Sequence, residues 1–175
     1  MRLETEHLFL RPWQESDAQT LYEYAKDPLV GPAAGWNAHT SVENSREIIK
    51  NVLSAPDTFA VVLKDRPDDT VGSVGIFSTE IEAGKGESEI GYWLGRPYWG
   101  RGLIPEAVRE LLRVCFAERG EERVWCGHFE GNEKSKRVIE KCGFHFVCRN
   151  TWRDQAGIDH ANRCYAITRE EWEAL

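Results

Sequence analysis

The sequence predicts a mixed α+β fold in which residues 1–175 form one domain. Two observations indicate this class. Residues 58–94 contain three β-rich runs separated by short polar turns, which is typical of an antiparallel meander. From residue 103 onward, a long amphipathic helix, a short strand, a second helix and a strand pair follow one another. This order predicts a strand–helix–strand crossover and then a hairpin.

The first 60 residues alternate between strand, helix and loop patterns. His7 to Trp13 is predicted as an opening strand, and a helix is expected to begin at Ser16–Asp17 and to end before Pro28. Residues 31–41 are rich in Gly, Pro and Asn and are predicted as a loop. A second helix should follow, with Ser41 or Thr40 as its N-cap.

The meander and the second half have clearer boundaries. The predicted meander strands are residues 58–63, 70–79 and 87–94, with a charged turn at residues 64–69. Apolar residues at helical spacing predict a helix over residues 103–118. The remaining predictions are a strand at 123–128, a helix at 132–141 closed by Gly143, and strands at 144–152 and 159–168 around a turn at Ala156–Gly157.

Charge and composition exclude several classes of protein. The formal net charge of −7 argues against a general nucleic-acid binder or a binder of anionic membranes, because both depend on basic side chains. No run approaches the ~18 apolar residues that span a bilayer, and the first residues lack the apolar core of a signal peptide. A cytoplasmic location is expected. The five scattered cysteines are interpreted as free thiols, and no metal site is expected.

The segment between the third meander strand and the long helix has the composition of a phosphate-binding loop. Gly95, Gly100 and Gly102 let a ligand approach the backbone closely, and the first helical turn exposes amides without internal partners. Together with the helix dipole these amides favour a pyrophosphate, while Arg96 and Arg101 add positive charge. Judged alone, the loop is equally well explained as a flexible strand-to-helix turn.

Two common phosphate motifs do not fit this loop. A Walker A loop requires Lys followed by Ser or Thr after its last glycine, where this chain has Leu103 and Ile104. A dinucleotide fingerprint requires Gly or Ala at the position of Pro105.

Three segments in order resemble the GNAT superfamily of N-acetyltransferases, in particular the branch of ribosomal-protein N-terminal acetyltransferases. They are Leu3 to Pro12 (LETEHLFLRP), Gly91 to Gly102 (GYWLGRPYWGRG) and Asn132 to Phe144 (NEKSKRVIEKCGF). The resemblance implies a mostly antiparallel central sheet flanked by helices, with a V-shaped cofactor opening between the fourth and fifth strands. It also implies acetyl-CoA as co-substrate.

The resemblance further implies which residues hold acetyl-CoA. The pantetheine arm would pair with backbone like an added strand. Asn132 would hydrogen-bond the pantetheine, and Ser135 would lie near the thioester sulfur. The remaining implied contacts are backbone at Trp93 and Leu94, and the amides that would hold the pyrophosphate, those of Tyr98, Trp99, Gly100, Arg101, Gly102 and Leu103.

Two positions depart from the family pattern. Pro97 stands where the loop pattern has Gln or Arg, and Arg96 is the nearest substitute. Ile139 stands where many members have a tyrosine that protonates the departing thiolate. Ser135 is therefore the candidate for assisting the thiolate, as in the ribosomal branch.

The implied reaction is direct attack of a neutral amine on the thioester carbonyl. Deprotonation at pH 7 costs about 1.4 kcal/mol for an α-amine but about 4.6 kcal/mol for a lysine, so a base matters more for lysine. Glu89 is the first candidate base and Glu87 the second. Both lie on one face of the same predicted strand, because side chains alternate along a strand. Asp154 is a third. Solvent-facing charges are the alternative interpretation for both glutamates.

Residues for the acceptor are less defined. Trp36, His39, Trp152 and His160 are candidates to line an acceptor cleft, and packed aromatics or surface histidines are the alternative. The basic side chains of Lys134, Lys136 and Arg137 either meet the 3′-phosphate of CoA or form a solvated helix face.

The sequence therefore predicts an N-acetyltransferase whose acceptor is a primary amine, on a protein N-terminus or on a small molecule. The protein is expected to be a monomer or a homodimer. A non-catalytic CoA-binding module and an acyltransferase for longer acyl groups remain alternatives.

Overall fold

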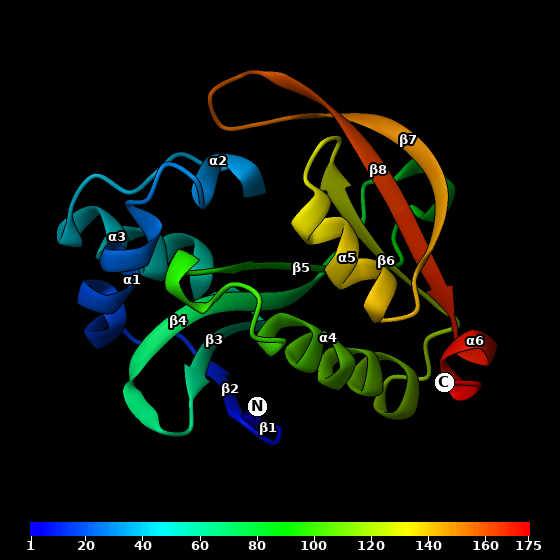
Figure 1. Cartoon of the computed structure of the whole chain (residues 1–175), viewed down its shortest axis with the longest axis horizontal. Helices are drawn as coiled ribbons and strands as arrows, with labels where there is room; N and C mark the ends of the chain where they lie inside the picture. Colours follow the sequence, from blue (N-terminus) through cyan, green and yellow to red (C-terminus); the bar gives the residue numbers. More distant parts are fainter.

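A computed structural model describes residues 1–175, and its centre is an eight-stranded sheet with the order β1-β2-β3-β4-β5-β6-β8-β7 (Figure 1). Every neighbouring pair is antiparallel except β5 and β6, which are parallel. The mixed α+β class and the meander are therefore confirmed. The strands are β1 (Leu3–Glu4), β2 (Leu8–Pro12), β3 (Thr58–Leu63), β4 (Arg66–Ser78), β5 (Ser88–Leu94), β6 (Arg123–Phe129), β7 (His145–Arg153) and β8 (Asp159–Thr168).

Six α-helices flank this sheet. They are α1 (Ala18–Ala25), α2 (Gly31–Ala34), α3 (Val42–Ile48), α4 (Leu103–Arg113), α5 (Glu133–Lys141) and α6 (Arg169–Glu173). A π-helical turn (Ile49–Leu53) extends α3, and a second π-helical turn (Val114–Glu118) extends α4. The Ser41 side chain accepts from the amide of Asn44, so the prediction of Ser41 as N-cap is confirmed.

Two sequence predictions are wrong in detail. Residues 31–41 were expected to be loop, but α2 occupies Gly31–Ala34, because Pro32 fits a first helical turn and Gly35 closes it with φ of 90°. The charged turn expected at residues 64–69 is only Lys64–Asp65, since β4 begins at Arg66. The residues around Pro67 lie where the β3–β4 register shifts, which is a position where strands tolerate proline.

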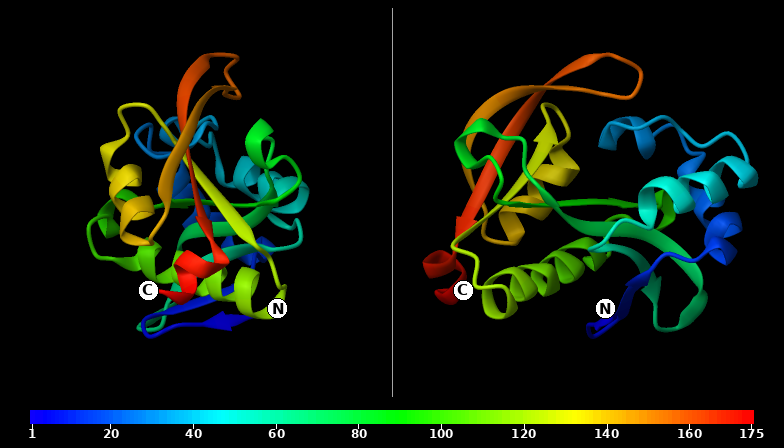
Figure 2. Two further views of the ribbon diagram at one scale, coloured as in Figure 1. Left: turned by 90° about the vertical axis from the view of Figure 1, so that its right-hand side faces the viewer. Right: turned by 180° about the vertical axis from the view of Figure 1, so that it is seen from behind.

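The sheet divides between β5 and β6. The two strands pair only at Ser88↔Val124 and Glu89↔Trp125. Beyond these pairs each strand keeps its outer neighbour, so β5 stays on β4 as far as Leu94 and β6 stays on β8 as far as Phe129. The two halves of the sheet diverge from Glu89 onward, and Figure 2 shows β5 and β6 running apart (Figure 2). The V-shaped opening that the resemblance implies is present. The fourth and fifth strands predicted from the sequence are β5 and β6 here.

We call the two halves of the sheet the β5 arm and the β6 arm. Apolar clusters hold them in place. On one side, α4 packs against β2, β4 and β5, and its fully buried Leu111 and Leu112 belong to the largest apolar cluster. On the other side, α1 and the segment after it form a second cluster that includes Trp13 and Trp93. Both clusters support the β5 arm, while the β6 arm contributes Val124 and Cys126 to the first cluster and Trp125 to a third, smaller one.

No helix in this chain is long and apolar enough to cross a membrane. All five cysteines are free thiols, and no group of three or more His, Cys, Asp or Glu side chains is placed to hold a metal ion.

One histidine is buried beside the β5 arm. His39 lies between α2 and α3 and is only 7% exposed. Its Nδ1 lies 2.8 Å from the Ser45 hydroxyl, and its ring packs 5.1 Å from the ring of Trp36. Burial lowers the pKa of His39 from 6.5 to about 4, because the charged imidazolium would lose its hydration.

We predict that His39 makes folding weaker in mild acid. The unfolded chain takes up this proton near pH 6.5 and the folded chain only near pH 4, so stability is lost as the pH falls through that window. From pH 7.5 to pH 5 the His39 contribution to the free energy of unfolding should fall by about 2 kcal/mol. Urea denaturation at both pH values should show that His39→Gln removes this part of the loss, whereas His145→Gln, at an exposed histidine, does not. An equal loss in wild type and His39→Gln would contradict the prediction.

Candidate functional site

The loop after β5 presents a row of free backbone amides. No amide from Gly100 to Ile104 donates to a backbone carbonyl, and this row ends in the first turn of α4. Gly100 and Gly102 have φ of 76° and 77°, a left-handed conformation that favours glycine, and no atom would meet a side chain there. Amides gathered at the positive end of a helix dipole form an anion site.

The predicted residues next to this row have different roles. The Tyr98 hydroxyl donates to Asp69 at 2.9 Å and lies 3.0 Å from the Tyr24 hydroxyl, so the side chain of Tyr98 anchors the loop. Arg96 is held by an ion pair, with its Nε 2.8 Å from Asp27. Arg101 is exposed and makes no ion pair, so it is the arginine of the loop that is free to meet an anion.

Trp99 connects the loop to both arms of the opening. Its indole Nε1 donates to the Leu94 carbonyl at 2.7 Å, and the Lys134 ammonium of α5 lies 3.9 Å from its ring centre. The Leu94 carbonyl, expected to pair with pantetheine, thus already has a donor. Lys134 lies at the loop, whereas Lys136 lines a separate groove of 330 Å³ with Arg163, so these lysines do not form one basic patch.

A hydroxyl pair lies on one side of the opening. The Ser135 and Tyr92 hydroxyls are 2.7 Å apart, and the Asn132 side chain accepts from the Ser135 amide at 3.2 Å. Burial raises the pKa of Tyr92 well above its usual range, so its phenol stays protonated. We call this side, which carries Tyr92 and Ser135, the Ser135 face.

Tyr92 was not among the residues predicted from the sequence. Side chains alternate along β5, so Tyr92 lies on the face opposite Glu89 and toward α5, and this alternation was the signal that could have found it. Ile139, at the position where the resemblance leads one to expect a tyrosine, is 1% exposed and belongs to the core. A phenol is nevertheless present here, supplied by β5 instead of α5.

Two carboxylates lie on the other side of β5, which we call the Glu89 face. The Thr79 hydroxyl donates to Glu89 at 2.5 Å, and burial raises the pKa of Glu89. Glu87 instead accepts from Arg123 at 2.8 Å and from the Trp125 indole at 2.6 Å, and the Arg123 guanidinium lowers its pKa. A proton acceptor near neutral pH needs a raised carboxyl pKa, so Glu89 fits that role and Glu87 does not.

Aromatic side chains line the Glu89 face along both arms. Trp36 packs 5.5 Å from Trp93 on the β5 arm, while Trp152 packs 5.4 Å from Phe129 on the β6 arm. The arms meet at Gly35, where a Cβ would lie 1.9 Å from the Trp152 ring.

The tip of the β7–β8 hairpin closes this face from above (Figure 1). The Gln155 amide donates to the Gly35 carbonyl at 3.1 Å, and the Asn37 amide donates to the Gln155 side chain at 3.0 Å. Three of the four acceptor candidates, Trp36, Trp152 and His160, therefore gather here. The fourth candidate, His39, is buried against Trp36 and Ser45 and is only 7% exposed.

Comparison with known proteins identifies relatives. Residues 7–145 match the family model described as the acetyltransferase (GNAT) domain. The chain is 31% identical to "Uncharacterized N-acetyltransferase p20" of Bacillus licheniformis over 147 residues, which cover 81% of each protein. It is 36% identical to "Putative ribosomal N-acetyltransferase YdaF" of Bacillus subtilis (strain 168) over 90 residues, which cover 50% of this chain and 48% of YdaF.

A solved structure shares the fold. The crystal structure of an acetyltransferase (GNAT family) from Bacillus anthracis superposes with a TM-score of 0.82 at 23% identity. The match covers 97% of this chain and 99% of that one, so it includes both arms of the divided sheet.

Proposed function

Since this chain belongs to the GNAT acetyltransferase family and is an acetyl-CoA-dependent N-acetyltransferase, we propose that it transfers the acetyl group to a primary amine by direct attack, with a protein N-terminal α-amine as acceptor. One observation carries the proposal. A proton acceptor, Glu89, and a hydroxyl pair, Ser135 and Tyr92, lie on opposite faces of β5 where the sheet divides.

The residues of the opening fit acetyl-CoA. The five free amides from Gly100 to Ile104 suit the pyrophosphate, and Arg101 and Lys134 add positive charge at the same loop. The pantetheine arm would lie along β5 beyond Glu89, where that strand has no partner on its β6 side. Asn132 and Ser135 at the start of α5 face the same opening.

Each face then has a separate task. Glu89 accepts a proton from the attacking nitrogen, and its raised pKa suits a base that works near neutral pH. On the opposite face the Ser135 hydroxyl hydrogen-bonds the departing sulfur, while the phenol of Tyr92 orients Ser135 and can donate a proton through it. Bond formation and bond breaking are thus assisted from opposite sides of one thioester.

The choice of an α-amine rests on chemistry and on a relative. Only about 1.4 kcal/mol is needed to deprotonate an α-amine at pH 7, which suits a base of this kind. The similarity to YdaF, which is named as a putative ribosomal N-acetyltransferase, supports a protein as the acceptor. A small-molecule amine is the second candidate, because the contact of Gln155 with Gly35 and Asn37 closes the Glu89 face and favours a small or extended acceptor.

The direct test is CoA-thiol release from acetyl-CoA with N-terminal peptides, polyamines and amino sugars as acceptors. We expect turnover with peptides that carry a free α-amine and none when that amine is blocked. Turnover with polyamines or amino sugars alone would favour the small-molecule acceptor. Tight acetyl-CoA binding without turnover on any of these amines would contradict the proposal and indicate a binding module.

The two faces predict a shared kinetic signature for two variants. Glu89→Gln removes the proton acceptor and Tyr92→Phe removes the phenol hydroxyl, so each should lower kcat by about 100-fold. Neither change touches the amide row, so the Kd for acetyl-CoA should stay within a factor of three. Stopped-assay kinetics and calorimetric titration measure the two quantities.

Glu87→Gln is the matched control, because it changes the same residue type on the same face. Glu87 is engaged by Arg123 and Trp125, so its variant should lose some stability while keeping kcat. The assignment fails if Glu87→Gln lowers kcat as much as Glu89→Gln does, or if the Glu89 and Tyr92 variants both retain wild-type kcat.

A further inference from the structure

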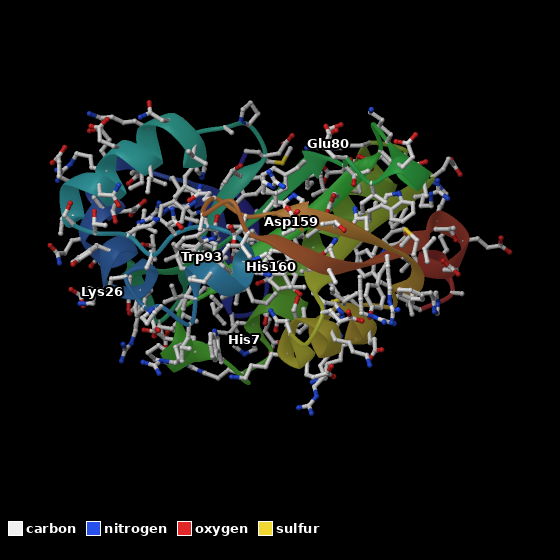
Figure 3. The ribbon with its side chains drawn as sticks, turned by 90° about the horizontal axis from the view of Figure 1, so that it is seen from above. His7, Lys26, Glu80, Trp93, Asp159 and His160 are labelled. Carbon is white, nitrogen blue, oxygen red and sulfur yellow. The ribbon has the colours of Figure 1, made fainter.

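A histidine–carboxylate pair stands at the top of the Glu89 face. His160 is the second residue of β8 and pairs in register with Trp152 on β7. Its Nε2 lies 2.6 Å from Asp154 Oδ2. In Figure 3, which looks down on the hairpin, His160 and Trp93 both lie toward the middle of the molecule (Figure 3).

His160 shares one aromatic wall with the site. Its ring stacks on Phe129 with centroids 4.3 Å apart and an interplanar angle of 10°. Phe129 lies four residues beyond Trp125 on β6, and Trp125 is the partner of Glu89, so Phe129 projects from the Glu89 face. Trp152 continues this wall from Phe129 to the Gly35 segment.

The pair has the geometry that fixes an imidazole tautomer. The Asp154 side chain is only 11% exposed and is itself held, because its Oδ1 accepts from the Ile158 amide at 2.9 Å. With Nε2–H donating to Asp154, the lone pair is on Nδ1, which has no hydrogen-bond partner in the protein. The His160 side chain is 31% exposed, which leaves part of the ring open to a ligand.

The charged neighbours of this pair are few. Asp159 is adjacent in the hairpin, but it is bound by Arg153 at 2.7 Å. Phe129 and the Gly35–Asn37 segment, which pack against the hairpin from the two arms, bring no titratable group. Glu130, next to Phe129, is engaged by Arg149 and Arg163.

We propose that His160, oriented by Asp154, removes the first proton from the acceptor amine at the entrance of the Glu89 face. This inference rests on the proposed function. An amine reaches the protein mainly as an ammonium ion, R–NH₃⁺, which has no lone pair for attack. Two protons must therefore leave its nitrogen, and one carboxylate accepts only one of them.

The acceptor nitrogen loses its two protons in turn. One proton moves from R–NH₃⁺ to Nδ1 of His160, which leaves R–NH₂ and an imidazolium still bonded to Asp154. The nitrogen lone pair forms the N–C bond, and the second proton passes to Glu89. As the C–S bond breaks, its electron pair stays on sulfur, which the Ser135 hydroxyl hydrogen-bonds. His160 and Glu89 then release their protons to water.

The pH profile of kcat/KM tests this role. Without His160 the protein depends on amine that is already neutral, which for a peptide α-amine is about one tenth of the total at pH 7. His160→Gln should therefore lose about tenfold in kcat/KM at pH 7 and little at pH 9. At pH 7 the loss should be larger for an aliphatic amine of higher pKa than for a peptide. Asp154→Asn should show a smaller loss with the same pH dependence.

Asp159→Asn is the matched control, because it breaks the neighbouring carboxylate–arginine pair of the same hairpin and should leave the profile unchanged. Acetyl-CoA affinity, measured for each variant, reports whether the fold is kept. A His160→Gln loss that is equal at pH 7 and pH 9, or no loss, overturns the inference while wild-type turnover upholds the proposed function. Wild type that turns over none of the amines overturns both.

Discussion

The rest of this structure depends on the division of the sheet after Glu89. Backbone groups of a strand need partners, and β5 has none on its β6 side for most of its length. The division persists because each arm is complete without the other: β4 and α4 hold β5, while β8 and α5 hold β6. A strand edge that is fixed and yet unpaired can accept an extended ligand without any rearrangement of the sheet.

This constraint also separates the chemistry. Because side chains alternate along β5, Glu89 and Tyr92 point to opposite sides of the same edge. Burial acts on both in the same direction and raises both pKa values, with opposite consequences. The carboxyl becomes a better base near neutral pH, and the phenol remains a donor. One strand therefore supplies an acceptor and a donor of protons whose roles do not interfere.

Local patterns in the sequence predicted most elements but not the contacts that assemble the site. The meander, the helix from Leu103 and the helix after Asn132 follow from periodicity and capping, which are properties of neighbouring residues. The closure of the Glu89 face joins Gly35 to Trp152 and Gln155, more than 110 positions apart, so no local pattern contains it. Tyr92 looked like one of several strand aromatics until α5 placed Ser135 beside it. The sequence pattern ranked Glu89 before Glu87 without a structural reason, which comes from distant residues: Arg123 and Trp125 bind Glu87, whereas Glu89 meets only the Thr79 hydroxyl.

We expect acetyl-CoA to occupy the divided edge of β5 and the amide row beside it. Hydrogen exchange of the backbone, measured with and without CoA, tests this most directly. We expect exchange to slow by at least tenfold at the amides of residues 90–94 that face β6 and at those from Gly100 to Ile104, while α3 and β3 stay unchanged. Unchanged exchange in both segments, with protection instead along the groove between Lys136 and Arg163, would show that CoA does not bind at the divided edge.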